Sequence, residues 1–417
     1  MFRKFRKFWR SIGPGLITGA ADNDASAIGT YTLAGARTGY SQLWVLLFIL
    51  PFMIALQEMS ARIGALSGCG LIGNIKRHYP VWLLVPAATI IVMANTFNVG
   101  ANIYGMAGAV NLLIPLPIEA LAILMSGIIL LITIFLRYHQ IVSIFKWISV
   151  SLFSYVLAFL AVDADWLSIL KHTIIPSITV SKDFFFILFA VMGASVSPYL
   201  YFWQASEEAE DFKQEHPRVR VCKFRVVPKG TLQRIDTDTA LGMFFSNFIS
   251  FFILALSATT LYQVGDGHIE TLREAAQMLH PLVGEYAFLL FSAGIVGSGL
   301  IAIPVLAGSA AYVLAELFNW HGSLDDSFSR AREFYIVMTL AVTAGLLIPF
   351  LGITPIQALF YTAVLNGLIS PLLIILIVHM ANNPQIVGPN TSRPLVNYLG
   401  YAIFFLMTAG AVFVFIS

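Results

Sequence analysis

The chain has 417 residues, of which 58% are hydrophobic and 11% charged, with a net charge of +2 and a mean hydropathy of +0.82. Soluble domains carry about a quarter charged residues, so this composition excludes a soluble globular protein and indicates an integral membrane protein. Its continuous apolar runs also exclude an outer-membrane barrel, whose strands alternate in polarity. No polar stretch is long enough for a separate domain, and we expect a single membrane domain over residues 1–417.

Eleven apolar segments are long enough to cross a bilayer, which takes about 20 helical residues. They cover roughly residues 11–37, 41–66, 82–112, 118–136, 141–162, 183–210, 236–262, 282–320, 331–349, 355–380 and 394–416. With a cytoplasmic N-terminus, all but four of the 24 Lys and Arg residues fall on the cytoplasmic side, which is the positive-inside pattern. The odd number of spans then puts the C-terminus outside the cell membrane.

The first apolar segment is interrupted by the polar residues Asp22, Asn23, Asp24 and Ser26. A carboxylate at membrane depth costs about 3 kcal/mol unless a cation, a proton or a water-filled cavity compensates for it. In an unwound segment both aspartates can face one cavity. Asp22 then carries a proton, or it is a hydrogen-bonded group at the end of a half-helix, and both interpretations stay open.

The sixth apolar segment is interrupted by Gly193, Ser195, Ser197 and Pro198. Proline removes a backbone donor and clashes with the preceding turn. Breaks in segments one and six indicate two halves of opposite orientation, and such paired breaks point to the binding site of a transporter. We place the first repeat at about 11–162, the second at about 183–380 and an extra helix at about 394–416. The alternative is two kinked helices without a ligand.

The residues at the two breaks offer hard oxygen ligands. Unwound backbone exposes carbonyl oxygens, Asp24 adds a full negative charge, and Ser26, Ser197 and Asn23 add hydroxyl and amide oxygens. Such ligands favour Mg²⁺, Ca²⁺ and Mn²⁺ over softer metals, although they also suit Na⁺ or a proton.

Three stretches resemble the Nramp family (natural resistance-associated macrophage protein) of divalent metal transporters: residues 13–15, 34–44 and 57–68. The resemblance covers most of the chain. It implies an all-α LeuT-like fold, a 5+5 inverted repeat with about 11 transmembrane helices of which helices 1 and 6 are broken. The aspartate of the family's Asp-Pro-Gly-Asn motif falls on Asp24, and its motif Gly-Ala-Thr-Val-Met-Pro-His falls on residues 193–199.

The resemblance implies a metal site made of Asp24 and the carbonyl oxygens of Ala21 and Ala194. The motif's asparagine is replaced by Ala27 and its methionine by Ser197. Methionine sulfur favours transition metals, so its loss implies a harder substrate ion, Mn²⁺ or Mg²⁺. The metal is transported, and no resident cofactor is expected.

Proton coupling is doubtful by the same comparison. The family's acidic residues in the third helix fall on Val99 and Asn102, and its motif histidine falls on Tyr199. Asn98 and Asn102 then line a hydrated vestibule or make hydrogen bonds between helices. Asn366 in the tenth segment is a further candidate for the ion path.

We therefore expect a secondary transporter, not an enzyme, that imports divalent metal cations by alternating access. The expected partners are the metal ion and the lipid bilayer, without nucleic acid, and a monomer is one possible state. The rivals are a proton- or sodium-coupled transporter of an organic solute on the same fold, and a channel or metal-sensing scaffold. Cys69 and Cys222 fall on the predicted cytoplasmic side, where reduced thiols are expected.

Overall fold

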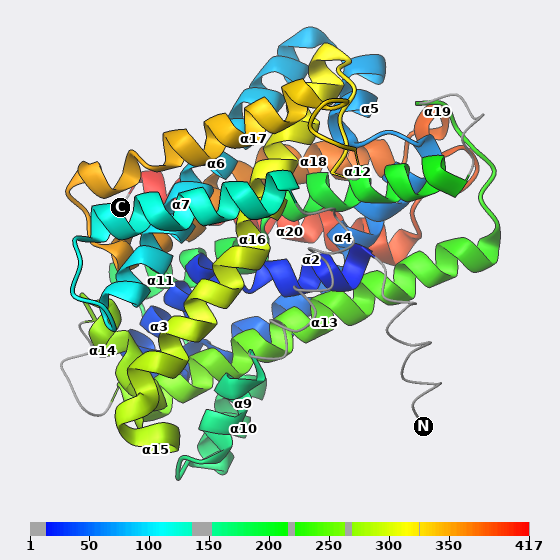
Figure 1. Ribbon diagram of the computed structural model, residues 1–417. Helices are drawn as coiled ribbons and strands as arrows, with labels where there is room; N and C mark the ends of the chain where they lie inside the picture. Colours follow the sequence, from blue (N-terminus) through cyan, green and yellow to red (C-terminus); the bar gives the residue numbers. More distant parts are fainter. Residues whose placement is uncertain (1–13, 136–151, 216–221, 263–268, 325, 417) are drawn as a thin grey trace, which may run out of the picture.

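The computed structural model describes residues 14–135, 152–215, 222–262, 269–324 and 326–416, and within these ranges the regular elements are helices (Figure 1). The first half contains α2 (Pro14–Asp22), α3 (Ala25–Thr38), α4 (Leu43–Ser67), α5 (Leu71–His78), α6 (Val81–Asn111), α7 (Ile118–Phe135), α9 (Phe153–Leu160) and α10 (Trp166–Ile174). The second half contains α11 (Lys182–Ser195), α12 (Pro198–Glu215), α13 (Lys229–Thr260), α14 (Leu272–Ala276), α15 (His280–Val283), α16 (Ala287–Phe318), α17 (Arg332–Gly345), α18 (Pro355–Ala381), α19 (Pro384–Val387) and α20 (Pro394–Ile416).

Nine stretches of the described residues are long and apolar enough to cross a membrane. One of them, Ala25–Ser67, contains both the second half of the predicted first helix and the whole predicted second helix. The predicted helix at 141–162 lies partly outside the described residues. The chain is therefore a multi-pass membrane protein with the predicted order of helices.

Both predicted helix breaks are present, and each has a local cause. Asp24 has extended backbone (φ −71°, ψ 175°) between α2 and α3, and its side chain caps the start of α3. Val196 (φ −105°, ψ 71°) ends α11, and Pro198 starts α12, where a missing N–H is tolerated. These breaks end each helix near the middle of its hydrophobic stretch.

The broken helices lie in the middle of the bundle. Figure 1 shows α2 and α3 following one another through its centre, with α13 running alongside and α16 crossing them. In an apolar 18-residue stretch of the α11–α12 pair, 78% is buried inside the protein. The corresponding value for α20 is 22%, so α20 faces the surroundings. The polar residues of both breaks are thus enclosed by protein.

Glycine allows the closest approaches to the broken helices. A Cβ added at Gly19 of α2 would overlap the backbone of Gly242 in α13. A Cβ added at Gly193 of α11 would overlap the backbone of Ala363 and Gly367 in α18. Close backbone packing of this kind is how membrane helices gain van der Waals contact without a hydrophobic driving force.

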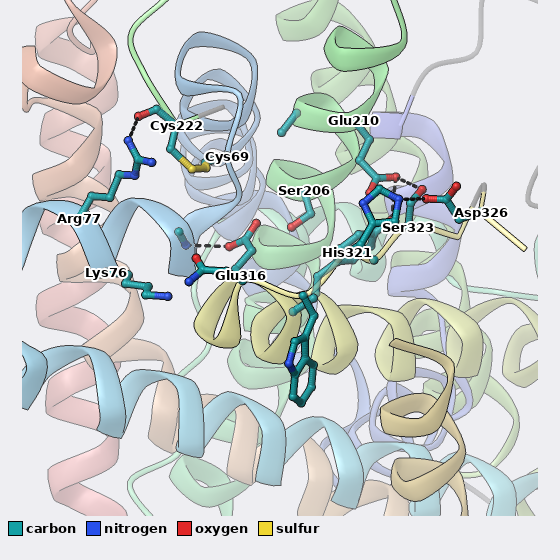
Figure 2. A pocket seen from close by; sticks show the side chains of 17 residues that line it. Cys69, Lys76, Arg77, Ser206, Glu210, Cys222, Glu316, His321, Ser323 and Asp326 are labelled. Carbon is teal, nitrogen blue, oxygen red and sulfur yellow. Dashed lines mark hydrogen bonds and ion pairs between the residues drawn. A yellow bond between two sulfur atoms is a disulfide. The ribbon is translucent and has the colours of Figure 1, made fainter. Parts of the chain in front are cut away.

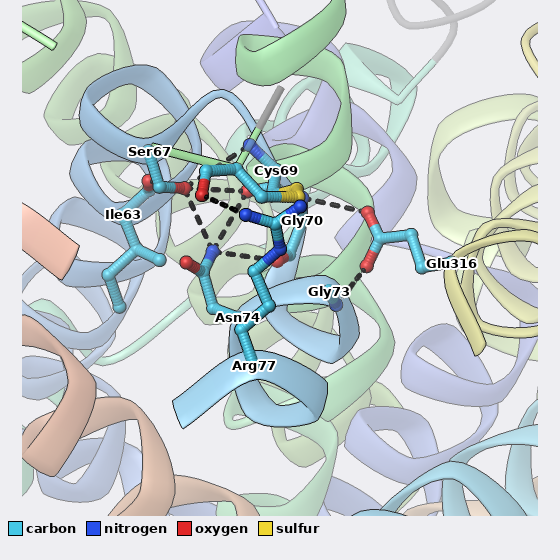
Figure 3. The surroundings of a disulfide bond; sticks show 9 residues. Ile63, Ser67, Cys69, Gly70, Gly73, Asn74, Arg77 and Glu316 are labelled. Carbon is cyan, nitrogen blue, oxygen red and sulfur yellow. Dashed lines mark hydrogen bonds between the residues drawn. A yellow bond between two sulfur atoms is a disulfide. The ribbon is translucent and has the colours of Figure 1, made fainter. Parts of the chain in front are cut away.

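Cys69 and Cys222 form a disulfide, so the expectation of two reduced thiols is wrong in this structure (Figure 3). Gly68 ends α4 in the left-handed conformation (φ 64°), which turns the chain so that Cys69 comes within 4.9 Å of Cys222, Cα to Cα. Arg77 adds a hydrogen bond of 2.9 Å to the Cys222 carbonyl oxygen. The two cysteines are 153 residues apart, and spacing alone does not predict such a pair.

Candidate ion-binding site

Asp24 is held by donors from its own helix. Its Oδ1 atom accepts hydrogen bonds from the Ser26 hydroxyl and the Ala27 backbone N–H, both 2.7 Å long. This is the N-cap arrangement, in which a side-chain oxygen satisfies an N–H group that has no partner within the helix. The Ser26 side chain is therefore turned toward Asp24.

Asn102 of α6 closes the other side of Asp24. Its Nδ2 atom donates to Asp24 Oδ2 at 2.9 Å, and its Oδ1 atom accepts from the Ala25 backbone N–H at 2.9 Å. The same Nδ2 atom lies 2.7 Å from Asn98 Oδ1. The two asparagines thus make hydrogen bonds between and within helices, the second of the two interpretations that the sequence left open.

Asp22 lies at the last position of α2 and bonds to a different helix. Its Oδ2 atom accepts a hydrogen bond of 2.5 Å from the Ser246 hydroxyl of α13. The adjacent Asn23 donates to the Ser246 carbonyl oxygen at 3.3 Å and accepts from the Ser250 hydroxyl at 3.1 Å. The first break is therefore held on one side by α6, through Asp24, and on the other by α13, through Asp22.

The second break is joined to the first by a tyrosine. The hydroxyl of Tyr199, in the first turn of α12, donates to the Ala21 carbonyl oxygen at 2.9 Å. The Ser197 hydroxyl donates to the Ala194 carbonyl oxygen at 2.8 Å. A carbonyl oxygen has two lone pairs, so Ala21 and Ala194 each keep one acceptor position beyond these bonds.

Asn366 lies on α18, the helix that packs against the second break. One turn later, the Ser370 hydroxyl lies 3.0 Å from the carbonyl oxygen of Val196 and 2.6 Å from that of Asn366, and it donates to both. The Asn366 side chain is buried, with 4% of its surface exposed. Asn366 thus lies one helical turn from a residue that contacts the second break.

The electrostatic feature of the site is a pair of buried carboxyl groups for which no ion pair is found in the part of the chain that the structure describes. Asp22 and Asp24 are 3% and 2% exposed. The ion pairs of the described residues involve other carboxylates, such as Glu58 and Asp236 with Arg62. A buried carboxylate without a cationic partner is costly in a membrane, so a cation is the ligand that this arrangement favours.

Every side chain predicted for the site lies at or beside the two breaks, but two relevant residues were missed. Ser246 and Ser250 of α13 supply the hydroxyls that face Asp22 and Asn23. They are four residues apart within a run rich in phenylalanine, and therefore share one face of the helix. That polar pair in an apolar run is the signal that could have identified them.

No group of three or more His, Cys, Asp or Glu side chains is positioned to hold a metal ion anywhere in the described part of the chain. An ion at the breaks would therefore be held by two carboxylates at most, with hydroxyl, carbonyl and water oxygens completing its shell. That ligand set suits a hard, partly hydrated cation.

Two larger cavities lie away from the breaks. One, of about 780 Å³, lies between α5, α12 and α16, and its polar lining includes Glu210, Glu316 and His321 (Figure 2). The other, of about 820 Å³, lies between α2, α9, α12 and α13. Neither is lined by Asp22 or Asp24, so the buried carboxyl groups of the breaks lie outside both cavities.

Comparison with known proteins decides the family. The family model described as natural resistance-associated macrophage protein-like matches residues 15–417. The chain belongs to the Nramp family. The Nramp chain is 24% identical over 411 residues to the divalent metal cation transporter MntH of Caldanaerobacter subterraneus subsp. tengcongensis, covering 96% of this chain and 91% of the relative. It is 25% identical over 399 residues to MntH of Acidiphilium cryptum, covering 92% and 86%.

Solved structures confirm the LeuT-like fold of this Nramp protein. The Eremococcus coleocola manganese transporter superposes with a TM-score of 0.74 at 15% identity, covering 97% of this chain and 86% of that one. Mhp1, a nucleobase-cation-symport-1 family transporter in a closed conformation, superposes with a TM-score of 0.61 at 13% identity, covering 96% and 89%. At these identities the structural likeness shows the fold alone.

Proposed function

We propose that this Nramp-family protein is a secondary transporter that moves divalent metal cations across a membrane by alternating access. The observation that carries the proposal is the meeting of two buried carboxylates, Asp22 and Asp24, with two interrupted helices at the centre of the fold. The relatives named as divalent metal cation transporters support the same substrate class. An organic solute as substrate is not favoured, because the site offers negative charge without a cationic partner.

Within this function, Asp24 and Ser197 with the carbonyl oxygens of Ala21 and Ala194 are the proposed metal site. Asp24 Oδ2 accepts one hydrogen bond, from Asn102, and so keeps a lone pair for an ion. The remaining lone pairs of the two carbonyl oxygens complete the proposed set of protein ligands. Water completes the shell.

The proposed substrates are the hard ions Mn²⁺ and Mg²⁺. Ser197 supplies a hydroxyl at the place where the family motif has a methionine, so the site lacks the soft sulfur ligand that favours transition metals. Mg²⁺ in particular keeps several waters when it binds to proteins. A site with one carboxylate, a hydroxyl and two carbonyl oxygens leaves room for those waters.

Proton coupling is proposed to be weak or absent. Asn102 occupies a position at which the family carries an acidic residue, and an amide does not titrate at neutral pH. In this chain its amide bridges Asp24 and the Ala25 N–H instead. The membrane potential alone favours import, because a negative interior attracts cations.

The orientation is proposed from the basic residues. A cytoplasmic N-terminus and an outside C-terminus place nearly all Lys and Arg residues on the cytoplasmic side. The two repeats, about 11–162 and 183–380, would then have opposite orientations. A monomer contains both breaks and therefore the whole proposed site.

The test is uptake into proteoliposomes containing the purified protein, with Mn²⁺, Mg²⁺ and Ca²⁺ offered separately and the internal pH recorded. We expect saturable uptake of Mn²⁺ and Mg²⁺ with little acidification of the lumen. A membrane-impermeant thiol reagent applied to single-cysteine variants would report the orientation. Saturable uptake of amino acids without uptake of any divalent ion would contradict the proposal.

A further inference from the structure

One oxygen atom of the buried carboxylates has no partner. The Asp22 side chain is buried, with 3% of its surface exposed. Its Oδ1 atom is inaccessible to solvent and receives no hydrogen bond from any described residue. Leaving a buried acceptor unsatisfied costs the full desolvation of that group, and more when the group is charged. A buried polar atom without a partner needs an explanation in a native protein, and one such explanation is a bound ion.

The neighbouring hydroxyls do not satisfy this oxygen. Ser246 donates its proton to the other oxygen, Asp22 Oδ2. Ser197 lies close enough to interact with the Asp22 carboxylate, but its hydroxyl donates to the Ala194 carbonyl oxygen at 2.8 Å. Both hydroxyl oxygens keep lone pairs, so the surroundings of Asp22 Oδ1 contain acceptors that could face the same cation.

Asp24 differs in this respect. Its Oδ1 atom already accepts two hydrogen bonds, from Ser26 and Ala27, and its Oδ2 atom accepts one from Asn102. Three donors satisfy most of the four lone-pair positions of a carboxylate. Of the two aspartates, Asp22 therefore has the more available oxygen.

We propose that Asp22 is a direct ligand of the transported ion, so that the ion is bound between two carboxylates: Asp22 through Oδ1 and Asp24 through Oδ2. This inference rests on the proposed function and adds a ligand that the family motif does not contain. Two carboxylates carry a charge of −2, which one divalent cation neutralises. The extra carboxylate compensates for the asparagine and methionine side chains of the family motif, in whose places this chain has Ala27 and Ser197.

The experiment compares Asp22→Asn, Asp24→Asn and Asp183→Asn in the full-length protein. Mn²⁺ binding is measured by isothermal titration calorimetry in detergent, and Mg²⁺ by competition against Mn²⁺. Asp183 lies exposed in the first turn of α11, so its variant makes the same chemical change outside the site. We expect Asp22→Asn to weaken Mn²⁺ binding at least tenfold, because asparagine keeps the size but loses the charge, and Asp183→Asn to bind as the wild type.

Thermal unfolding without metal distinguishes a ligand from a structural residue. Because Asp22 Oδ1 has no partner in the protein, Asp22→Asn should melt no lower than the wild type, and the rise in melting temperature caused by Mn²⁺ should shrink. Asp24→Asn should melt lower, since its amide group would face the amide donor of Asn102.

Two results overturn the proposal while the proposed function stands: Mn²⁺ binding by Asp22→Asn within twofold of the wild type, or a metal-free melting temperature lowered as much as that of Asp24→Asn. If the wild-type protein binds and transports no divalent ion, the proposed function itself fails.

Discussion

The hydroxyl of Tyr199 donates a hydrogen bond of 2.9 Å to the carbonyl oxygen of Ala21, and this bond joins the interruptions of the two broken helices. Tyr199 is 2% exposed, so the bond is buried within the protein. Because Ala21 lies one residue before Asp22, the position of the first break depends on a residue of the second. The two breaks thus form one structural unit.

Removing this bond should destabilise the unit. Tyr199→Phe keeps the ring and deletes the donor, which should lower the free energy of unfolding by about 1 kcal/mol. Thermal unfolding in metal-free detergent measures the loss. Tyr361→Phe, at a residue that is 43% exposed, is the matched control and should have no effect. Equal stability of both variants would show that the bond does not hold the breaks together.

Asp24→Ala should abolish metal uptake and also reduce stability. The substitution removes the proposed charged ligand, and it deletes the N-cap of α3, which typically costs about 1 kcal/mol. Proteoliposome uptake and thermal unfolding measure the two effects separately, with Asp183→Ala as the control. Unchanged uptake by Asp24→Ala would remove this residue from the mechanism.

Ser197→Met should shift ion preference toward softer metals. A thioether in place of the hydroxyl favours Mn²⁺ and Cd²⁺ over Mg²⁺. The uptake rates of Mn²⁺ and of Cd²⁺, each divided by that of Mg²⁺, should therefore rise. Ser197→Ala separates the gain of sulfur from the loss of the hydroxyl. If Ser197→Met and Ser197→Ala rank the ions identically, sulfur has no part in the selectivity of this site.

The bond between Asn102 and Asp24 predicts strong coupling of their substitutions. Asn102→Leu leaves the Ala25 N–H and Asp24 Oδ2 without partners, which should cost about 2 kcal/mol. In a double-mutant cycle with Asp24→Ala, the effects should be clearly less than additive, because either substitution removes the shared bond. Thermal unfolding provides the four values, and simple additivity would contradict the geometry.

The disulfide gives a prediction about both stability and compartment. Cys69→Ser should lower the free energy of unfolding by about 2–4 kcal/mol, because Cys69 and Cys222 close a long loop. A reductant should destabilise the wild type and leave Cys69→Ser unchanged. Thiol titration of the unfolded, unreduced protein counts free cysteines, and finding two would mean that the bond does not form where the protein is made.

Much of the fold could be predicted from the sequence because a bilayer imposes simple requirements. Apolar stretches of sufficient length predict the helices, and Pro198 with its small neighbours predicts the second break. The pairing of Asp24 with Asn102 could not be predicted, since hydrogen bonding between helices names no partner and the asparagine was also consistent with a hydrated path. Ser246 and Ser250 were not predicted, because two serines in a long membrane helix are a weaker signal than a carboxylate or a proline.

The sequence by itself determined the class of the protein, the helices that are interrupted and the presence of two aspartates at membrane depth, since each follows from local composition. The tertiary structure alone decided which carboxylate oxygens are already occupied. Asn102 reaches Asp24 from 78 residues away and Ser246 reaches Asp22 from 224 residues away. Hydrogen-bond donors brought in by distant helices are what make Asp24 a helix cap and leave Asp22 an oxygen without a partner.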